Sequence, residues 1–125
     1  MIFGIGTDIV EIKRIETMTS LDKFASKILS QNEKEFYDSL TNQKQIKYIS
    51  KQFAAKEAIA KAIGTGIRND THFKNIEVIR DKNGAPIFNA LNRLEKIISD
   101  LGITKTHVSL ADERDYAIAI AVLEK

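Results

Sequence analysis

The chain has 125 residues, of which 19 are basic and 17 acidic, and it contains no cysteine. A chain of this length can bury a core without disulfides or a structural metal, and the lack of cysteine fits a reducing compartment. The net charge of +2 does not by itself indicate nucleic-acid binding. The longest apolar run, residues 116–123, is much shorter than the roughly 20 residues of a spanning helix. We expect one cytoplasmic domain without a membrane or nucleic-acid partner.

The first half of the sequence predicts one strand followed by helices. Residues 2–10 are predicted as a strand, and short helices are predicted over about 11–17 and 20–29. Ser30 and Glu33 form a capping-box pattern, which predicts a helix from there to about Leu40. The longest helix is predicted from Lys44 to Ile63, because Gly64 follows where a terminating glycine is expected.

The second half is richer in strands. Residues 73–81 are predicted as a strand, 82–86 as a turn, and 86–90 as a short strand that enters a helix over about 90–101. Residues 106–112 and 116–124 are predicted as antiparallel strands joined by a tight polar loop. Strands and helices come in blocks without regular alternation, which favours an α+β fold with an antiparallel sheet.

The first strand contains an unusual acid. Gly4, Gly6 and Asp8 share one face of this strand, because alternate side chains point the same way. The glycines can leave open space in which Asp8 meets a metal or a phosphate. Alternatively, they let a helix pack closely, and Asp8 caps the helix that follows. The residues alone leave both interpretations open.

The long helix carries a second candidate group. At about 100° per residue, Glu57 lies on the margin of the predicted buried face and Lys61 lies one turn farther along. The two form an ordinary helix-stabilising pair, or Glu57 joins Asp8 in a two-carboxylate site suited to Mg²⁺. The glycines at 64 and 66 indicate a helix end and, more weakly, an anion-binding nest of backbone amides.

Four sequence blocks carry a family resemblance. Taken in order and spacing, they resemble the holo-[acyl-carrier-protein] synthase family of 4′-phosphopantetheinyl transferases: GIGTDIVEIKRIE (4–16), FAAKEAIAKAIGTGI (53–67), NGAP (83–86) and HVSLADERDYAIA (107–119). The resemblance covers nearly the whole chain. It implies the α+β fold of that family, with a small antiparallel sheet packed with one long and several shorter helices.

The same resemblance implies an activity. Members move the 4′-phosphopantetheine group of coenzyme A, their co-substrate, onto a serine of apo-acyl carrier protein in fatty-acid synthesis, and release adenosine 3′,5′-bisphosphate. The resemblance further implies Mg²⁺ as cofactor and a homotrimer whose active sites lie between neighbouring subunits. Two alternatives stay open: a catalytically silent module that binds acidic carrier proteins, and an Mg²⁺-dependent enzyme that acts on another nucleotide.

The family's functional residues correspond to residues of this chain. Its metal-binding acids correspond to Asp8 and Glu57, and its pyrophosphate-contacting lysine to Lys61. We expect these three to be the catalytic residues. Basic residues on the helices after the first strand, which would dock the acidic acceptor, correspond to Arg14 and Lys23, and we expect the positive charge of Lys27 to join them. The positions around the coenzyme correspond to Gly64, Gly66, Gly84 and Pro86.

Two positions depart from the family pattern. Asp112 stands where many members have a histidine, and we expect it to lie at the coenzyme site. Gln52 stands where many members have an arginine before the phenylalanine of the long helix. The resemblance therefore implies that the 3′-phosphate of coenzyme A has a weaker contact here, or is contacted by Lys44, Lys51 or Lys56.

The last strand has two different faces. Alternation gives it a flat face of small residues, Ala117, Ala119 and Ala121, and a bulky face with Ile118, Ile120 and Val122. A trimer that packs sheet against sheet would bury both faces. A helix that lies on the sheet of a monomer would explain the small face equally well.

Overall fold

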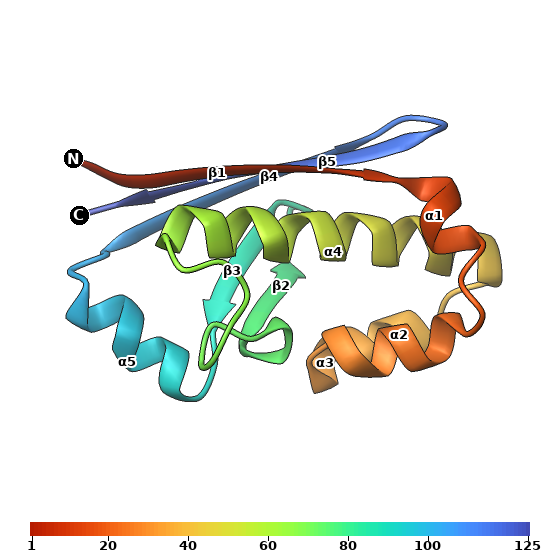
Figure 1. Cartoon of the computed structure of the whole chain (residues 1–125), viewed down its shortest axis with the longest axis horizontal. Coiled ribbons are helices and arrows are strands. Elements are labelled where there is room, and N and C mark those ends of the chain that lie inside the picture. The colour runs from red at the N-terminus through yellow and green to blue at the C-terminus, as the bar shows by residue number, and fades with distance from the viewer.

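A three-stranded antiparallel sheet and one long helix dominate the computed structural model, which describes residues 1–125. The sheet has the order β1-β5-β4, formed by Ile2–Glu11, Tyr116–Glu124 and Lys105–Asp112 respectively. Helix α4 (Asn42–Ile63) runs along one face of this sheet, as Figure 1 shows. A separate two-stranded antiparallel sheet is formed by β2 (Ile76–Arg80) and β3 (Pro86–Ala90). The expected α+β class is confirmed.

Helix α4 lies very close to the sheet because both surfaces are made of small residues. Ala58 and Ala62 on the helix are buried, as are the three alanines on the inner face of β5. A Cβ atom on Gly4 would overlap the carbonyl oxygen of Ala62, and one on Gly6 would overlap that of Ala58. The close-packing interpretation of these glycines is therefore correct. The expectation of open space beside them is wrong, because the backbone of α4 fills it.

Three short helices follow β1. Helices α1 (Ile12–Glu16), α2 (Leu21–Ile28) and α3 (Gln31–Asp38) agree with the predicted elements to within two residues at most ends. The capping box is present, because the Ser30 hydroxyl accepts from the Glu33 amide while the Glu33 carboxylate accepts from the Ser30 amide. Gly64 ends α4 with a φ of 100°, a left-handed conformation that glycine adopts without strain.

Two predicted boundaries in the second half are wrong. Strand β2 begins at Ile76, not at residue 73, because residues Phe73–Asn75 form a short 3-10 turn in which the His72 ring accepts from the Lys74 amide. Helix α5 (Arg93–Asp100) begins three residues later than predicted, after Asn92 with a φ of 56°. The predicted β4–β5 hairpin is confirmed, with its antiparallel register running from Lys105↔Glu124 to Asp112↔Ala117.

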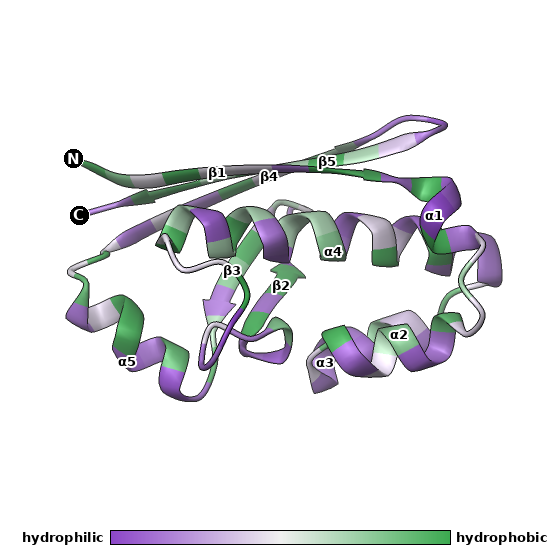
Figure 2. Ribbon diagram, in the orientation of Figure 1, coloured by the Kyte–Doolittle hydropathy of each residue, from purple (hydrophilic) through white to green (hydrophobic).

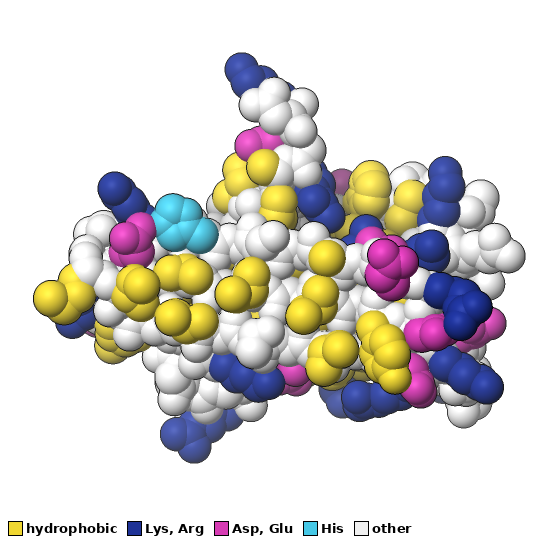
Figure 3. Space-filling view, turned by 90° about the horizontal axis from the view of Figure 1, so that it is seen from above, with side chains coloured by type: hydrophobic (Ala, Val, Ile, Leu, Met, Phe, Trp, Pro, Cys, Tyr) yellow, Lys and Arg dark blue, Asp and Glu magenta, His cyan; other side chains and the backbone are white.

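The two faces of the three-stranded sheet have different surroundings. Helix α4 covers the inner face, which explains the row of small residues on β5. The outer face is uncovered and apolar: the exposed fractions are 58% for Ile5, 62% for Ile9, 44% for Ile118 and 45% for Ile120. Figure 2 shows alternating hydropathy along these strands, and Figure 3 shows the hydrophobic side chains gathered across this face. None of the helices has the length and apolar character needed to cross a bilayer.

Candidate active site

Strand β1 and helix α4 bring Asp8 and Lys61 together. The Lys61 Nζ lies 3.1 Å from Asp8 Oδ1 and donates to the carbonyl of Thr7 at 3.0 Å. The Asp8 side chain is 18% exposed and that of Lys61 is 51% exposed, so both remain within reach of a ligand. Asp8 does not cap α1, whose first turn has no side-chain cap. The capping interpretation of Asp8 is therefore wrong.

Glu57 lies on α4 next to this pair and is half-buried. Burial raises the pKa of the Glu57 carboxyl above its ordinary value, and the negative charge of Asp8 raises it further, while Lys61 and Arg14 act in the opposite direction. Lys61 pairs with Asp8, not with Glu57 as in an ordinary helix-surface pair. Two carboxylates thus lie close enough to repel each other, and two cations flank them.

This arrangement fits a hard divalent cation. The chain has no cluster of three or more His, Cys, Asp or Glu side chains that would enclose a metal completely. Mg²⁺ commonly takes only one or two protein carboxylates, and its other ligands are water and substrate phosphate. Such a cation would also relieve the repulsion between Asp8 and Glu57. The residues present are therefore suited to Mg²⁺ that arrives with a phosphorylated substrate.

Three basic residues on α1 and α2 were predicted to dock an acceptor. The Arg14 guanidinium lies 5.7 Å from the centre of the Phe53 ring, and its charge lowers the pKa of Glu57. Arg14 therefore borders the cluster. Lys23 and Lys27 are exposed on α2. Their spacing of four residues places them on one face of that helix.

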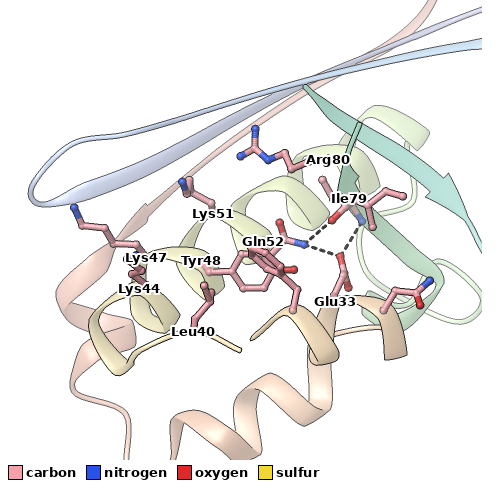
Figure 4. A pocket seen from close by; sticks show the side chains of 12 residues that line it. Glu33, Leu40, Lys44, Lys47, Tyr48, Lys51, Gln52, Ile79 and Arg80 are labelled. Carbon is pink, nitrogen blue, oxygen red and sulfur yellow. Dashed lines mark hydrogen bonds between the residues drawn. The ribbon is translucent and has the colours of Figure 1, made fainter. Parts of the chain in front are cut away.

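A hollow of about 550 Å³ lies on another side of α4, between α3 and β2. Five residues separate Gln52, which lines it, from Glu57, so the two side chains leave the helix about 140° apart. Figure 4 shows Tyr48 and Leu40 in this hollow beside basic residues. We call it the basic pocket, because its walls include four cationic side chains: Lys44, Lys47, Lys51 and Arg80.

A buried polar network supports the floor of the basic pocket. The Gln52 Nε2 donates to Glu33 Oε2 at 2.6 Å and to the Val78 carbonyl at 3.0 Å. The Lys56 Nζ donates to Glu33 Oε1 at 2.6 Å and to the Phe73 carbonyl at 2.8 Å. Burial lowers the pKa of Lys56, and the adjacent Glu33 opposes that shift. Lys56 is fully buried and paired, so the expectation that it might contact a phosphate is wrong.

The remaining coenzyme positions fall into two groups. Gly84 and Pro86 lie next to Arg80, which pairs with Pro86 across the β2–β3 ladder and donates from Nη1 to the Gly84 carbonyl at 3.0 Å. Asp112, at the end of β4, has its Oδ1 3.4 Å from the Nζ of Lys51. The structure thus places these residues around the basic pocket.

The second group of coenzyme positions consists of Gly64 and Gly66, which lie at the end of α4 beyond Lys61. Both have positive φ values, 100° and 68°. The Gly64 amide donates to the carbonyls of Ala60 and Lys61, and the Gly66 amide donates to the carbonyl of Ala60. These two amides close the helix end and are not free for an anion. The anion-nest interpretation is therefore wrong for them.

The comparisons with known proteins agree with this geometry. Residues 4–121 match the family model of the 4′-phosphopantetheinyl transferase superfamily. The chain belongs to this superfamily. It is 45% identical to the holo-[acyl-carrier-protein] synthase of Cronobacter sakazakii, over 98% of each chain.

Solved structures support the same assignment at the level of the fold. The holo-[acyl-carrier-protein] synthase of Neisseria meningitidis superimposes with a TM-score of 0.91 and 40% identity, with all of both chains covered. That of Bacillus anthracis, solved in complex with CoA (3′,5′-ADP), has a TM-score of 0.84 and 38% identity and covers 98% of this chain and 96% of its own. The family resemblance and the transferase fold predicted from the sequence are confirmed.

Sequence reasoning missed two features of this structure, one that lines the basic pocket and one that is buried. Arg80 and Lys47 line the basic pocket, and neither belongs to a motif. The one available signal was that Arg80 lies near the end of the strand predicted over 73–81, close to a loop, because loops held by a rigid scaffold often carry binding residues. The Glu33–Lys56 pair was also missed, because its partners lie 23 positions apart and only the tertiary fold joins them.

Proposed function

We propose that this chain is a holo-[acyl-carrier-protein] synthase. It moves the 4′-phosphopantetheine group of coenzyme A onto a serine hydroxyl of apo-acyl carrier protein and releases adenosine 3′,5′-bisphosphate. The observation that carries the proposal is the meeting of Asp8, Glu57 and Lys61 at the β1–α4 contact. Relatives of this name that match over nearly the full chain support it.

Asp8 and Glu57 would hold Mg²⁺ in this enzyme. The bound ion would neutralise charge on the pyrophosphate of coenzyme A, which lowers the barrier to phosphoryl transfer. Lys61 supplies a further positive charge, and its exposed Nζ can move from Asp8 to a pyrophosphate oxygen. Such electrostatic stabilisation and positioning are the main contributions that a protein makes to this class of reaction.

The bond changes define what the site must accommodate. The serine oxygen forms a bond to the phosphorus that carries the pantetheine arm, and the proton of the serine hydroxyl would pass to the carboxylate of Asp8 or Glu57 or to a water held by the metal. The bond from that phosphorus to the bridging oxygen breaks, and adenosine 3′,5′-bisphosphate leaves with this oxygen. Negative charge therefore develops on the leaving group, on which Lys61 and the metal would act.

The acidic acceptor would approach over α1 and α2. Arg14, Lys23 and Lys27 are exposed there, and Arg14 borders the catalytic cluster. Opposite charge on a partner accelerates its encounter and fixes its orientation. We therefore assign these three residues to docking of the carrier protein.

We further propose a homotrimer. Ile5, Ile9, Ile118 and Ile120 form an uncovered apolar face, and large exposed patches of this kind commonly mark interfaces. The catalytic cluster and the basic pocket lie on different sides of α4. Assembly would let one subunit present its basic pocket to the cluster of a neighbour. We place this single-domain protein in the cytoplasm.

Sedimentation velocity tests the assembly. The wild type should sediment as a trimer. Ile120→Lys, which puts a charge in the centre of the apolar face, should sediment as a monomer with a native circular dichroism spectrum. Ser99→Lys, at an exposed position on α5, serves as the charge-adding control. A wild type that stays monomeric at all concentrations would contradict the trimer.

A mass-shift assay tests the activity. Purified apo-acyl carrier protein, coenzyme A and Mg²⁺ should give a carrier protein heavier by one phosphopantetheine group, and chelation of the metal should prevent this gain. Absence of product with several carrier proteins would reject the proposal. Carrier binding without product would favour the silent module, and turnover of another nucleotide in competition with coenzyme A would favour the third alternative.

A further inference from the structure

Helix α2 carries two of the three residues assigned to docking, Lys23 and Lys27, so its position decides where the acceptor lies. Its inner side packs through the fully buried Ala25 and through the Phe24 ring, whose centre lies 5.4 Å from that of Phe53 on α4. Apolar contacts of this kind are non-directional. They hold α2 against the chain without fixing its position along its own axis.

One polar contact joins α2 to a different element. The Tyr37 hydroxyl on α3 donates at 2.7 Å to Oδ1 of Asp22, which lies in the first turn of α2. The other side-chain hydrogen bond of α2 belongs to its own N-cap, where the Lys23 amide donates to the Ser20 hydroxyl. None of the ion pairs of the chain includes a residue of α2. The Tyr37–Asp22 bond is therefore the one directional contact by which another element holds this helix.

Tyr37 is itself held in place. Its side chain is fully buried, and its carbonyl accepts from Gln45 Nε2 on α4 at 3.0 Å. Burial raises the pKa of the Tyr37 hydroxyl above its ordinary value, and the bond to Asp22 raises it further, so the hydroxyl remains a donor. Contacts thus run from α4, which carries Glu57, through α3 to α2. Figure 1 shows α2 and α3 beneath α4, on the side opposite to the three-stranded sheet.

The negative charge of Asp22 distinguishes two possible roles for this contact. Asp22 lies three residues before the buried Ala25, so the two share one side of α2, while Lys23 and Lys27 are exposed. A carboxylate on a docking helix weakens binding of an acidic partner by its charge alone. Removal of Asp22 therefore improves docking if only its charge matters, and impairs docking if its bond to Tyr37 holds the helix.

We propose that the Tyr37–Asp22 hydrogen bond anchors α2 and thereby positions Lys23 and Lys27 for the acyl carrier protein. This inference rests on the proposed function, which assigns docking to α2. Because Tyr37 is buried, it acts through Asp22 and is a positioning residue. Without the bond, α2 occupies its docking position in a smaller fraction of the molecules. The apparent dissociation constant for the carrier rises in inverse proportion to that fraction.

Fluorescence anisotropy with labelled apo-acyl carrier protein, without coenzyme A, tests the anchor. Tyr37→Phe keeps the buried ring and removes the donor, and Asp22→Ala removes the acceptor. We expect each to weaken carrier binding about 3- to 10-fold, within the range for one lost hydrogen bond. The double variant should bind no more weakly than either single variant, because all three lack the same bond.

Two further variants serve as controls. Asp22→Asn loses the same charge at the start of α2 as Asp22→Ala but keeps an acceptor oxygen, so it should bind at least as tightly as wild type. Asp100→Asn, at an exposed position on α5, should behave as wild type. Tighter binding by Asp22→Ala would show that only the charge matters and would overturn the anchor. Unchanged binding by Tyr37→Phe, or additive losses in the double variant, would also overturn it.

Kinetics and amide hydrogen exchange separate the anchor from a general loss of structure and from the proposed function. Tyr37→Phe should raise KM for the carrier by the same factor and leave KM for coenzyme A unchanged, and a rise in both would overturn the anchor. Exchange over residues 21–28 should be faster in Tyr37→Phe and close to wild type in Asp22→Asn. A wild type that neither binds nor modifies any carrier protein would reject the proposed function. The exchange measurement would still decide whether the bond anchors α2, because unchanged exchange in Tyr37→Phe would overturn it.

Discussion

The charged side chains on two sides of helix α4 differ in their burial and in their partners. Toward β1, Asp8, Glu57 and Lys61 are partly exposed, and the negative charge of Asp8 contributes to the raised pKa of Glu57. Toward α3 and β2, Lys56 and Glu33 are fully buried, and every buried side-chain nitrogen and oxygen has a hydrogen-bond partner. Charged side chains that are buried and paired within the chain stabilise the fold. Partly exposed carboxylates that repel each other remain available to bind a ligand. The predictions below test this difference.

Lys56→Met should produce the largest loss of stability. It removes the one cation from a buried network in which Glu33 and Glu77 are both less than 4% exposed. Removing one partner of a buried ion pair costs about 3–5 kcal/mol, because the other charge stays buried without compensation. Urea denaturation at neutral pH measures the free energy of unfolding. A loss below about 1 kcal/mol would contradict the stabilising role of the buried Lys56–Glu33 pair.

Glu57→Gln should abolish most activity and leave the fold intact. It keeps the side-chain size but removes one of two carboxylates proposed to hold the metal. We expect kcat to fall at least about 100-fold, comparable to the loss of one electrostatic contact to a transition state. The mass-shift assay at several Mg²⁺ concentrations measures this, and Glu95→Gln, an exposed acid on α5, is the control. A near-normal kcat would contradict the proposal that Glu57 holds the metal.

Gly6→Ala should affect both stability and activity. The added Cβ would overlap the carbonyl oxygen of Ala58, so β1 and α4 must separate. Overpacking of this kind costs about 1–3 kcal/mol, and the separation also moves Asp8 away from Glu57. Thermal unfolding and the transfer assay measure the two effects, with Ser99→Ala at an exposed position on α5 as control. Wild-type values in both would contradict the close contact.

The difference between these regions also explains what the sequence could predict. Local signals were sufficient for the capping box at Ser30, the helix end at Gly64 and the β4–β5 hairpin, because each depends on neighbours within a few residues. Helical and strand periodicity identified the faces that carry Asp8 and Glu57.

The other features could not be predicted from local patterns, because they depend on contacts between residues far apart in the sequence. Whether Gly6 faced a ligand or a helix depended on where α4 lies, which no local pattern determines. The same limit applies to Lys56, which the family resemblance offered as a phosphate contact although it is buried, and to Arg80, which reaches the basic pocket through the pairing of β2 with β3. The roles proposed for Asp8, Glu57 and Lys61 came from the family resemblance.

The pH dependence of stability should distinguish wild type from Glu57→Gln. Burial and Asp8 raise the pKa of Glu57 in the folded state, so ionised Glu57 opposes folding. Its contribution is most favourable below the ordinary pKa of a glutamate and is lost as pH rises through the raised value. Without metal, Glu57→Gln should therefore gain stability over wild type between acidic and neutral pH. Saturating Mg²⁺ should reverse that gain, and a constant difference across pH would contradict the coupling.

Lys61→Met should have the smallest effect on stability, in contrast to Lys56→Met on the same helix. The Lys61–Asp8 pair is half-exposed on the lysine side, and such pairs contribute about 0–1 kcal/mol. The methionine keeps the aliphatic stem against β1, so only the charge is lost. Urea denaturation should therefore show a change below about 1 kcal/mol, while KM for coenzyme A rises because a contact to its pyrophosphate is gone. A loss as large as that of Lys56→Met would mean that both sides of α4 use charge to hold the fold, and the proposed division between them would not stand.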